Sequence, residues 1–344
     1  MKMEQKYIDY MLDVLERMLA IKSPSGYTKE ITGFLCSELQ ASGYQPNTLR
    51  KGGVNVNLGG NGSPIMLFGH VDTLGGVVAS IKSNGGLMLT NIGGLNPNNT
   101  ETEQVTVITR DGREYEGTLQ VANASIHVNP KINDPRDFKA NIEVLLDEFV
   151  TSAKEVEELG IQNGDFIALN PRFTVTKKGY IKSRFLDDKA SSAVLLTLAK
   201  YYADEKLIPN RNVWLSFTMF EEIGHGGAAG IPDCIEDVIS VDMGCVGTGL
   251  KCTERMVSIC PKDSGGVYHY ALTNELIAAA KKAKADYALD VYPMYGSDVE
   301  VTLRAGFDVR HGLIGPGVYA SHGYERTHID GLVNTFKLLH AYLT

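Results

Sequence analysis

The chain has 344 residues, of which 43% are hydrophobic, and it carries a formal net charge of −8 with a pI of about 5.5. This length suits one large α/β domain, or one domain with an insertion, and the composition is sufficient for a sizeable core. The acidic balance argues against nucleic acids and anionic membranes as partners.

The cysteines and the first residues bear on the compartment. Five cysteines are scattered without a Cys-x-x-Cys pair, which favours reduced thiols over a disulfide framework or a thiolate zinc site. Residues 1–22 lack the unbroken apolar run of a signal peptide, and no run is long enough to span a bilayer. We therefore expect a cytoplasmic protein with neither a membrane nor a nucleic acid as partner.

The predicted elements begin with two amphipathic helices. Apolar residues recur at helical spacing over 8–19 and again over 31–39, and the turn-forming segment 23–26 separates them. Two short apolar strands follow at 54–58 and 65–68.

The pattern changes between Gly75 and Arg172. Helical periodicity gives way to short β-type runs such as 105–109, which turn signals separate. We interpret 75–172 as an inserted, mostly β domain that contains one helix at 138–152. The main α/β domain is then formed by 1–74 and 173–344.

Alternation of helices and strands returns after residue 181. Helices are predicted at 189–202, 274–285 and 331–343, and strands at 213–219 and 238–241. Strands that alternate with helices indicate an α/β fold with a mostly parallel central sheet, flanked by helices on both faces.

Acids and histidines gather where the predicted strands end, which is where open α/β sheets form their sites. Each has an ordinary alternative: a histidine can be satisfied in a turn, and paired aspartates can cap the helix that follows them. Their joint occurrence favours a functional site. The residues are His70, Asp72, Asp187, Asp188, Glu221, Glu222, Asp242 and His322.

The pair Glu221-Glu222 is the sharpest of these signals. It follows the apolar run 213–220 and precedes the glycine-rich segment 223–227. Two adjacent acids at the end of a buried strand are costly to bury unless a cation compensates them. A metal ion provides that compensation, and it allows one carboxylate to act as a ligand while the other takes a proton from bound water.

In their order and spacing these segments resemble the glutamyl-aminopeptidase-like family of dinuclear metallopeptidases, which includes the tetrahedral aminopeptidases. The likeness covers nearly the whole chain, from 23–27 to the Gly-Pro-…-His segment at 315–322. The intervening segments that carry it are Gly69-His70-Val71-Asp72, Ile92-Gly93-Gly94, Gly164-Asp165, Asp187-Asp188-Lys189, Glu221-Glu222-Ile223-Gly224, Asp242, Asp263-Ser264-Gly265 and Gly296-Ser297-Asp298.

The resemblance implies a set of metal ligands. His70 and His322 would each hold one ion, Asp187 would bridge the two ions, and Glu222 and Asp242 would complete the coordination. Two divalent ions per chain are therefore expected, and this ligand chemistry suits zinc first, with cobalt or manganese as alternatives.

The resemblance also implies the reaction. Glu221 would be the general base of a metal-dependent aminopeptidase that removes amino-terminal residues from peptides, and Asp72 would orient His70. The inserted domain would mediate assembly into a homo-oligomer such as a dodecamer.

Three departures from the family pattern stand out. Thr73 replaces the glutamate that usually follows the His-x-Asp motif, and Lys189 stands where arginine is common. The terminal histidine lacks its usual Arg-Tyr-x-His-Ser context. His322 keeps the usual distance from Gly315, and His328 is its rival.

Three alternative functions remain open at this point. A deacylase, dipeptidase or carboxypeptidase with a narrow small-molecule substrate would use the same metals and base. A glycosidase with paired carboxylates would need acids on both sides of a bond, which adjacent glutamates do not obviously give. A non-enzymatic scaffold with a degenerate site is favoured only by Thr73.

Overall fold

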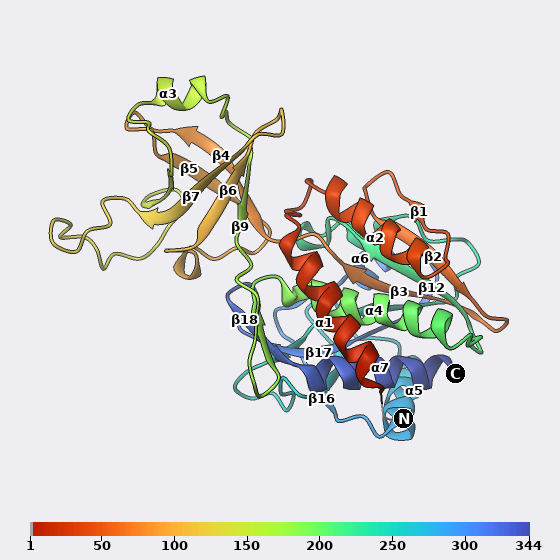
Figure 1. Ribbon diagram of the computed structural model, residues 1–344. Helices are drawn as coiled ribbons and strands as arrows, with labels where there is room; N and C mark the ends of the chain where they lie inside the picture. The colour runs from red at the N-terminus through yellow and green to blue at the C-terminus, as the bar shows by residue number, and fades with distance from the viewer. Residues whose placement is uncertain (1–2) are drawn as a thin grey trace.

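Figure 1 shows the computed structural model of the chain, which describes residues 3–344. The first two residues of the predicted 1–74 segment lie outside the described residues. A large α/β body carries the C-terminus, and a small, mostly β unit that also bears the helix α3 stands to one side of it (Figure 1). No helix within residues 3–344 has both the length and the apolar character needed to cross a bilayer.

Five helices of the large body lie close to their predicted positions, with ends that move by a few residues, and a sixth, at 298–304, was not predicted. The helices are α1 (Gln5–Ala20), α2 (Lys29–Ala41), α4 (Leu186–Asp204), α5 (Tyr270–Ala283), α6 (Asp298–Arg304) and α7 (Ile329–Leu343), with short 3-10 turns η2 (Glu221–Ile223) and η3 (Gly226–Ala228).

The large body is built on one sheet of twelve strands. Its strands are β1 (Asn47–Thr48), β2 (Val54–Gly59), β3 (Pro64–His70), β10 (Thr174–Val175), β11 (Tyr180–Ser183), β12 (Asn212–Thr218), β13 (Asp237–Val241), β14 (Gly244–Val246), β15 (Val257–Lys262), β16 (Tyr287–Val291), β17 (Arg310–Tyr319) and β18 (Glu325–His328).

The sheet is mixed, which corrects the prediction of a mostly parallel sheet. The central strands β12, β3, β13 and β17 are neighbours and run parallel. Strands β2, β15 and β18 flank this group in antiparallel orientation. Periodicity along the sequence locates strands but carries little information on the direction in which each one is paired.

Strand β3 shows why the sheet is buried on both faces. Ile65 and Leu67 belong to a core that also contains residues of α1, α4 and α7. Met66 and Phe68 point the other way, into a second core that contains Val299 of α6. All four side chains are at most 1% exposed. A strand that is apolar at every position is expected when both faces are covered.

The small unit is a closed barrel of antiparallel strands in the order β4-β5-β8-β7-β6-β9. The strands are β4 (Gly75–Ile81), β5 (Leu87–Ile92), β6 (Gln104–Ile108), β7 (Glu114–Val121), β8 (Ile142–Leu146) and β9 (Phe166–Leu169), with the turn η1 (Pro97–Asn99). A mixed α/β architecture with a barrel-like second sheet is therefore present.

The helix predicted at 138–152 is wrong. That stretch contains strand β8, which pairs with β5 and β7 and closes the barrel, and the helix α3 (Ala153–Glu158) begins only after it. Ser152 accepts a hydrogen bond from the backbone N–H of Glu155, so it caps the start of a helix and does not end one. Strand pairing across the barrel outweighs local periodicity here.

The barrel is tied to the large body by a buried ion pair. Arg184, which is 1% exposed, lies 3.0 Å from Oε1 of Glu103 and also donates to the carbonyl of Asn99. Arg172 donates to the same oxygen at 2.5 Å. The barrel segment 99–103 is thereby held beside Arg184, just before α4.

Candidate metal centre

The predicted site residues come together because parallel strands end at the same edge of the sheet. His70 ends β3, η2 with Glu221 and Glu222 follows β12, and Asp242 follows β13. The remaining residues come from the first turn of α4 and from the loop between β17 and β18.

The structure brings the candidate ligands into two adjacent groups. Ligand atoms of His70, Asp188 and Asp242 lie within 4.8 Å of one another. The same holds for Asp187, Glu222 and His322. All five predicted ligands are therefore neighbours, and Asp188 joins them as a sixth candidate.

Asp187 lies between the two histidines. Its Oδ1 is 3.1 Å from Nε2 of His70, and its Oδ2 is 3.6 Å from Nε2 of His322. Nε2 of His322 is also 3.7 Å from Oε2 of Glu222. A carboxylate with one oxygen toward each histidine has the arrangement that a bridging ligand requires.

His328, the rival of His322, lies away from these groups. Its Nε2 is 2.8 Å from the carbonyl oxygen of Lys178, and its Nδ1 accepts the backbone N–H of Asp330 at the start of α7. It is therefore a capping residue of α7.

The carboxylates of the site outnumber its cationic partners. Burial raises the pKa of Glu221 and of Glu222 well above the usual range, and neighbouring carboxylates add to this. Burial, followed by the charge of Asp187, raises the pKa of Asp242 to about 7. Within residues 3–344, the ion pairs of Asp187, Glu221 and Glu222 are with the two histidines alone.

The contacts of His70 with carboxylates also shift the pKa values of His70 and Asp187. Burial lowers the pKa of His70, but its hydrogen bond to Asp187 and the nearby carboxylates raise it well above its ordinary value. Burial raises the pKa of Asp187, but the bond to His70 holds the pKa below its ordinary value. Both shifts reflect the carboxylates that surround His70.

The donor set fits divalent cations. A group of buried carboxylates without lysine or arginine partners is expensive unless another cation compensates it. Oδ1 of Asp188 is also buried without a hydrogen-bond partner. Imidazole nitrogens and carboxylate oxygens are the ligands that zinc, manganese and cobalt share, so the residues present can hold such ions.

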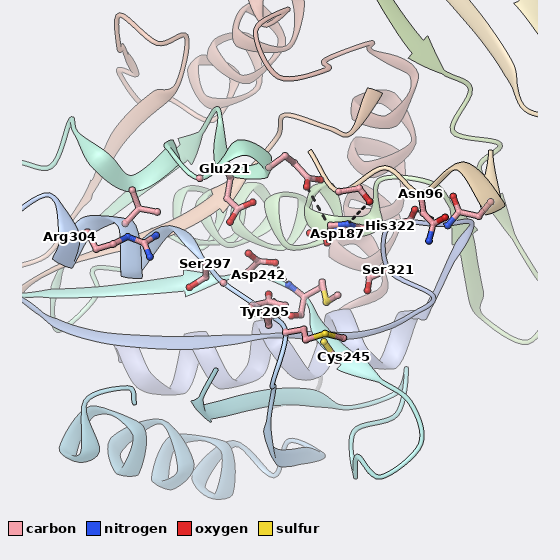
Figure 2. Close-up of a pocket in the computed structure, with 18 residues that line it drawn as sticks. Asn96, Asp187, Glu221, Asp242, Cys245, Tyr295, Ser297, Arg304, Ser321 and His322 are labelled. Atoms are coloured by element: carbon pink, nitrogen blue, oxygen red, sulfur yellow. Dashed lines mark hydrogen bonds and ion pairs between the residues drawn. The ribbon is translucent and has the colours of Figure 1, made fainter. Parts of the chain in front are cut away.

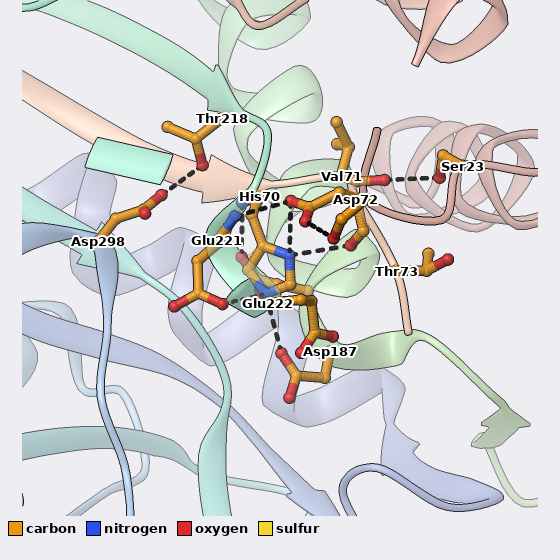
Figure 3. A network of polar contacts seen from close by, with 12 residues as sticks. Ser23, His70, Val71, Asp72, Thr73, Asp187, Thr218, Glu221, Glu222 and Asp298 are labelled. Atoms are coloured by element: carbon orange, nitrogen blue, oxygen red, sulfur yellow. Dashed lines mark hydrogen bonds and ion pairs between the residues drawn. The ribbon is translucent and has the colours of Figure 1, made fainter. Parts of the chain in front are cut away.

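Asp72 connects His70 with Glu221, as Figure 3 shows. Its carboxylate accepts the backbone N–H of Glu221 at 3.2 Å and the hydroxyl of Ser25. Nδ1 of His70 lies 3.1 Å from the backbone carbonyl of Asp72 and 3.8 Å from the carboxylate. The main chain of Asp72 therefore orients the imidazole, and its side chain orients Glu221.

The loop that carries the two glutamates is fastened by Asp298. This buried carboxylate accepts the hydroxyl of Thr218 (Figure 3) and the backbone N–H of Gly227 at 2.7 Å. Oε2 of Glu221 is 3.7 Å from Nε2 of His70, and the Glu221 side chain keeps 16% exposure. Glu221 is thus close to the ligands and still accessible.

A cavity of about 510 Å³ opens onto the site (Figure 2). This volume suits a small ligand or the end of a peptide. Its lining combines the candidate ligands with segments of the barrel and of α6, and includes Gly94, Asn96, Asn99, Asp187, Glu221, Glu222, Asp242, Met243, Cys245, Met294, Tyr295, Ser297, Val301, Arg304, Ser321 and His322.

Two contributions were missed by sequence reasoning. Gly94 leaves room for the His322 ring, because a Cβ there would lie 2.4 Å from Nδ1. Glu325 accepts the backbone N–H groups of Asp187 and His322, each at 3.0 Å. The Gly93-Gly94 pair was visible as a motif, but nothing in the sequence around Glu325 distinguishes it from a surface acid.

Comparison with known proteins decides the family. The family model described as M42 glutamyl aminopeptidase matches residues 52–338, which is most of the chain. The chain belongs to this family. The chain is therefore an aminopeptidase, as the family resemblance implied.

One curated relative and two solved structures are similar to this chain over nearly its whole length. YhfE of Bacillus subtilis (strain 168), whose name places it among the aminopeptidases, is 40% identical over 96% of each chain. The TET aminopeptidase of a marine sediment Thaumarchaeota archaeon has a TM-score of 0.86 at 19% identity, covering 97% of this chain and 96% of that one. The TET1 peptidase of Pyrococcus horikoshii, described as assembling into a tetrahedron or a large octahedral shell, has a TM-score of 0.83 at 22% identity, covering 97% and 99%.

Proposed function

We propose that this M42 aminopeptidase removes amino-terminal residues from peptides with two divalent ions per chain, zinc first, held by His70, Asp187, Glu222, Asp242 and His322. The observation that carries this proposal is the position of Asp187, which belongs to one group of ligand atoms with Glu222 and His322 and also lies 3.1 Å from His70 of the other group. Cobalt and manganese share the same ligand preferences.

Metal ions bound there would lower the pKa of a coordinated water and polarise the scissile carbonyl. The chain itself provides the proton transfer. Glu221 is within reach of the ligands and keeps partial exposure toward the cavity. It would take a proton from the attacking water and later return it to the leaving amine.

The surroundings of Glu221 suit this role. Its backbone N–H is fixed by Asp72, and the following loop is fixed by Asp298. A general base held in one orientation loses little entropy on reaching the reactive geometry. A general base works best when its pKa lies near the working pH. Burial raises the pKa of Glu221 and so moves it from the ordinary acidic range toward neutral pH.

The barrel is proposed as the assembly module. We assign 75–172 to this inserted domain and 1–74 with 173–344 to the catalytic domain, and we propose a homo-oligomer such as a dodecamer. Support comes from the tetrahedral and octahedral assemblies described for the Pyrococcus protein. Apolar side chains exposed on the barrel unit, Ile126 at 71% and Val128 at 66%, also suit a contact between chains.

We further propose a cytoplasmic location. All five cysteines are free, and those at positions 252 and 260 are buried. Unpaired cysteines are typical of a reducing compartment.

Two substitutions test the proposed roles. Glu221→Gln is expected to lower kcat by about 10²–10⁴-fold, as loss of a general base does, while two metal ions per chain are retained. Asp187→Ala is expected to lose metal instead. The measurements are turnover of an aminoacyl-p-nitroanilide and metal content by elemental analysis. Full activity of Glu221→Gln, or two ions bound to Asp187→Ala, would show that the assignment is wrong.

A further inference from the structure

Glu325 is a buried acid that the proposed chemistry does not use. It is the first residue of β18 and is 2% exposed. Its Oε1 accepts the backbone N–H of His322, and its Oε2 accepts the backbone N–H of Asp187, both at 3.0 Å. One carboxylate thus holds the main chain at two candidate ligands.

The fold explains how one side chain reaches both segments. Strand β18 pairs with β11 in antiparallel orientation, and Glu325 lies opposite Ser183. The chain after Ser183 leads directly to Asp187 at the start of α4. The loop before Glu325 carries His322. The Glu325 carboxylate therefore stands where the two ligand-bearing segments meet.

The backbone of the His322 loop needs such support. Ala320 and His322 have φ values of 59° and 63°, in the left-handed region that residues with a Cβ seldom adopt. A conformation of this kind persists only where surrounding contacts impose it. For His322 these contacts are Glu325 on the N–H side and the Asn99 side chain on the carbonyl side at 3.2 Å.

Within residues 3–344, the Glu325 carboxyl group has no lysine, arginine or histidine side chain as an ion-pair partner. Nearby Glu254, in contrast, pairs with Arg326. A buried carboxylate that lacks a cation costs stability. The backbone N–H groups of Asp187 and His322 offset part of this cost, together with the neighbouring backbone of Leu186.

We propose that Glu325 is a positioning residue, which fixes Asp187 relative to His322 and so sets the affinity for the metal ion held by Asp187, Glu222 and His322. The inference rests on the proposed function, because it assumes that this group binds a metal. Contacts that orient ligands typically change metal affinity by about 10- to 100-fold when they are removed.

The test measures zinc binding to the full chain, stripped of metal and titrated in competition with a chromophoric chelator. Glu325→Gln keeps the side-chain volume and one acceptor oxygen. Its amide NH₂ replaces the other oxygen and cannot accept a hydrogen bond from the second backbone N–H. Glu325→Ala removes both acceptors. Both are expected to weaken one of the two zinc sites by about 10- to 100-fold, the alanine variant more. Raising the zinc concentration should restore turnover, with an unchanged KM for peptide.

Glu254→Gln is the matched control, because it removes a carboxylate that contacts the residue next to Glu325 on the same strand. It should bind two zinc ions as the wild type does. Wild-type affinity at both sites of Glu325→Gln would overturn the proposal, and so would an equal loss in Glu254→Gln. If Glu325→Ala does not fold, the glutamine variant decides. A wild-type chain that binds no zinc would overturn the proposed function as well.

Discussion

At the scale of single residues, Arg304 differs from the rest of the cavity wall. It is the one lysine or arginine among the lining residues and it is exposed, with the carboxyl group of Glu300 close enough to feel its charge. Figure 2 shows it on the same side of the cavity as Glu221. An exposed guanidinium beside a substrate pocket favours a carboxylate on the ligand.

We therefore expect Arg304 to favour peptides whose first residue is acidic. Arg304→Gln should lower kcat/KM for glutamyl-p-nitroanilide by about 10- to 100-fold, the range of a hydrogen bond to a charged group. The value for leucyl-p-nitroanilide should stay almost unchanged. Equal losses on the two substrates, or none on either, would refute this role.

The sequence predicted that Glu221, Glu222 and Asp242 lie together, because each follows a run of apolar residues and such positions share one edge of a parallel sheet. Their role as metal ligands was implied by the family resemblance and stays a prediction. It could not predict Asp188 as a neighbour of His70, since the same pair of aspartates also suits a helix cap. Glu325 was beyond prediction, because its importance depends on the pairing of β18 with β11 and on no local pattern.

At the scale of secondary structure elements, α6 contributes Val301 and Arg304 to the cavity wall and also carries Glu300, which forms a carboxyl pair with Asp263. Glu300 is 9% exposed and packs so closely on Gly265 that a Cβ there would lie 1.7 Å from Oε2. Burial, followed by its hydrogen bond to Asp263, raises the pKa of Glu300 to about 8. Glu300 thus keeps its proton in the folded chain at neutral pH.

This raised pKa predicts a pH dependence of stability. The folded state holds the proton more tightly than the unfolded state, whose pKa is the ordinary 4.5. The contribution of Glu300 is therefore complete below about pH 4.5 and is lost as the pH rises through about 8. Glu300→Gln imitates the protonated form, so its urea midpoint relative to wild type should rise from pH 6 to pH 9.

Metal-loaded protein should be used for these unfolding curves. Glu16→Gln, on the exposed side of α1, is the control whose offset from wild type should stay constant with pH. If the difference in urea midpoint between Glu300→Gln and wild type also stayed constant with pH, Glu300 would not hold a proton in the folded chain.

Elements with a regular buried face could be predicted from the sequence, but strand β8 could not. Elements of the large body were predicted because each buries a face at a regular period, as β3 and α1 do. The helix expected at 138–152 failed because β8 is specified by its partners β5 and β7 across the barrel. Pairing with strands that are distant in sequence does not produce a periodic pattern of apolar residues.

At the scale of the whole molecule, the segment between β7 and β8 extends from the barrel away from the large body (Figure 1). It exposes Ile126 and Val128, whereas Ile208, at 73% exposure, lies on the large body. Apolar side chains on a projecting loop suit contact with another chain.

We expect a native mass near twelve times the chain mass of 37.5 kDa. The double variant Ile126→Asp with Val128→Asp should shift this mass to smaller species, because charges at a buried contact are costly. Ile208→Asp should leave it unchanged. Mass photometry measures all three proteins, and an unaltered mass for the double variant would exclude this loop from the interface.

The most direct test of the central claim is hydrolysis of a panel of aminoacyl-p-nitroanilides before chelation, after chelation, and after zinc, cobalt or manganese is returned. The account predicts activity that disappears with the chelator and returns with metal. Activity that survives complete removal of metal would contradict it, and so would a chain that holds two ions and cleaves no member of the panel.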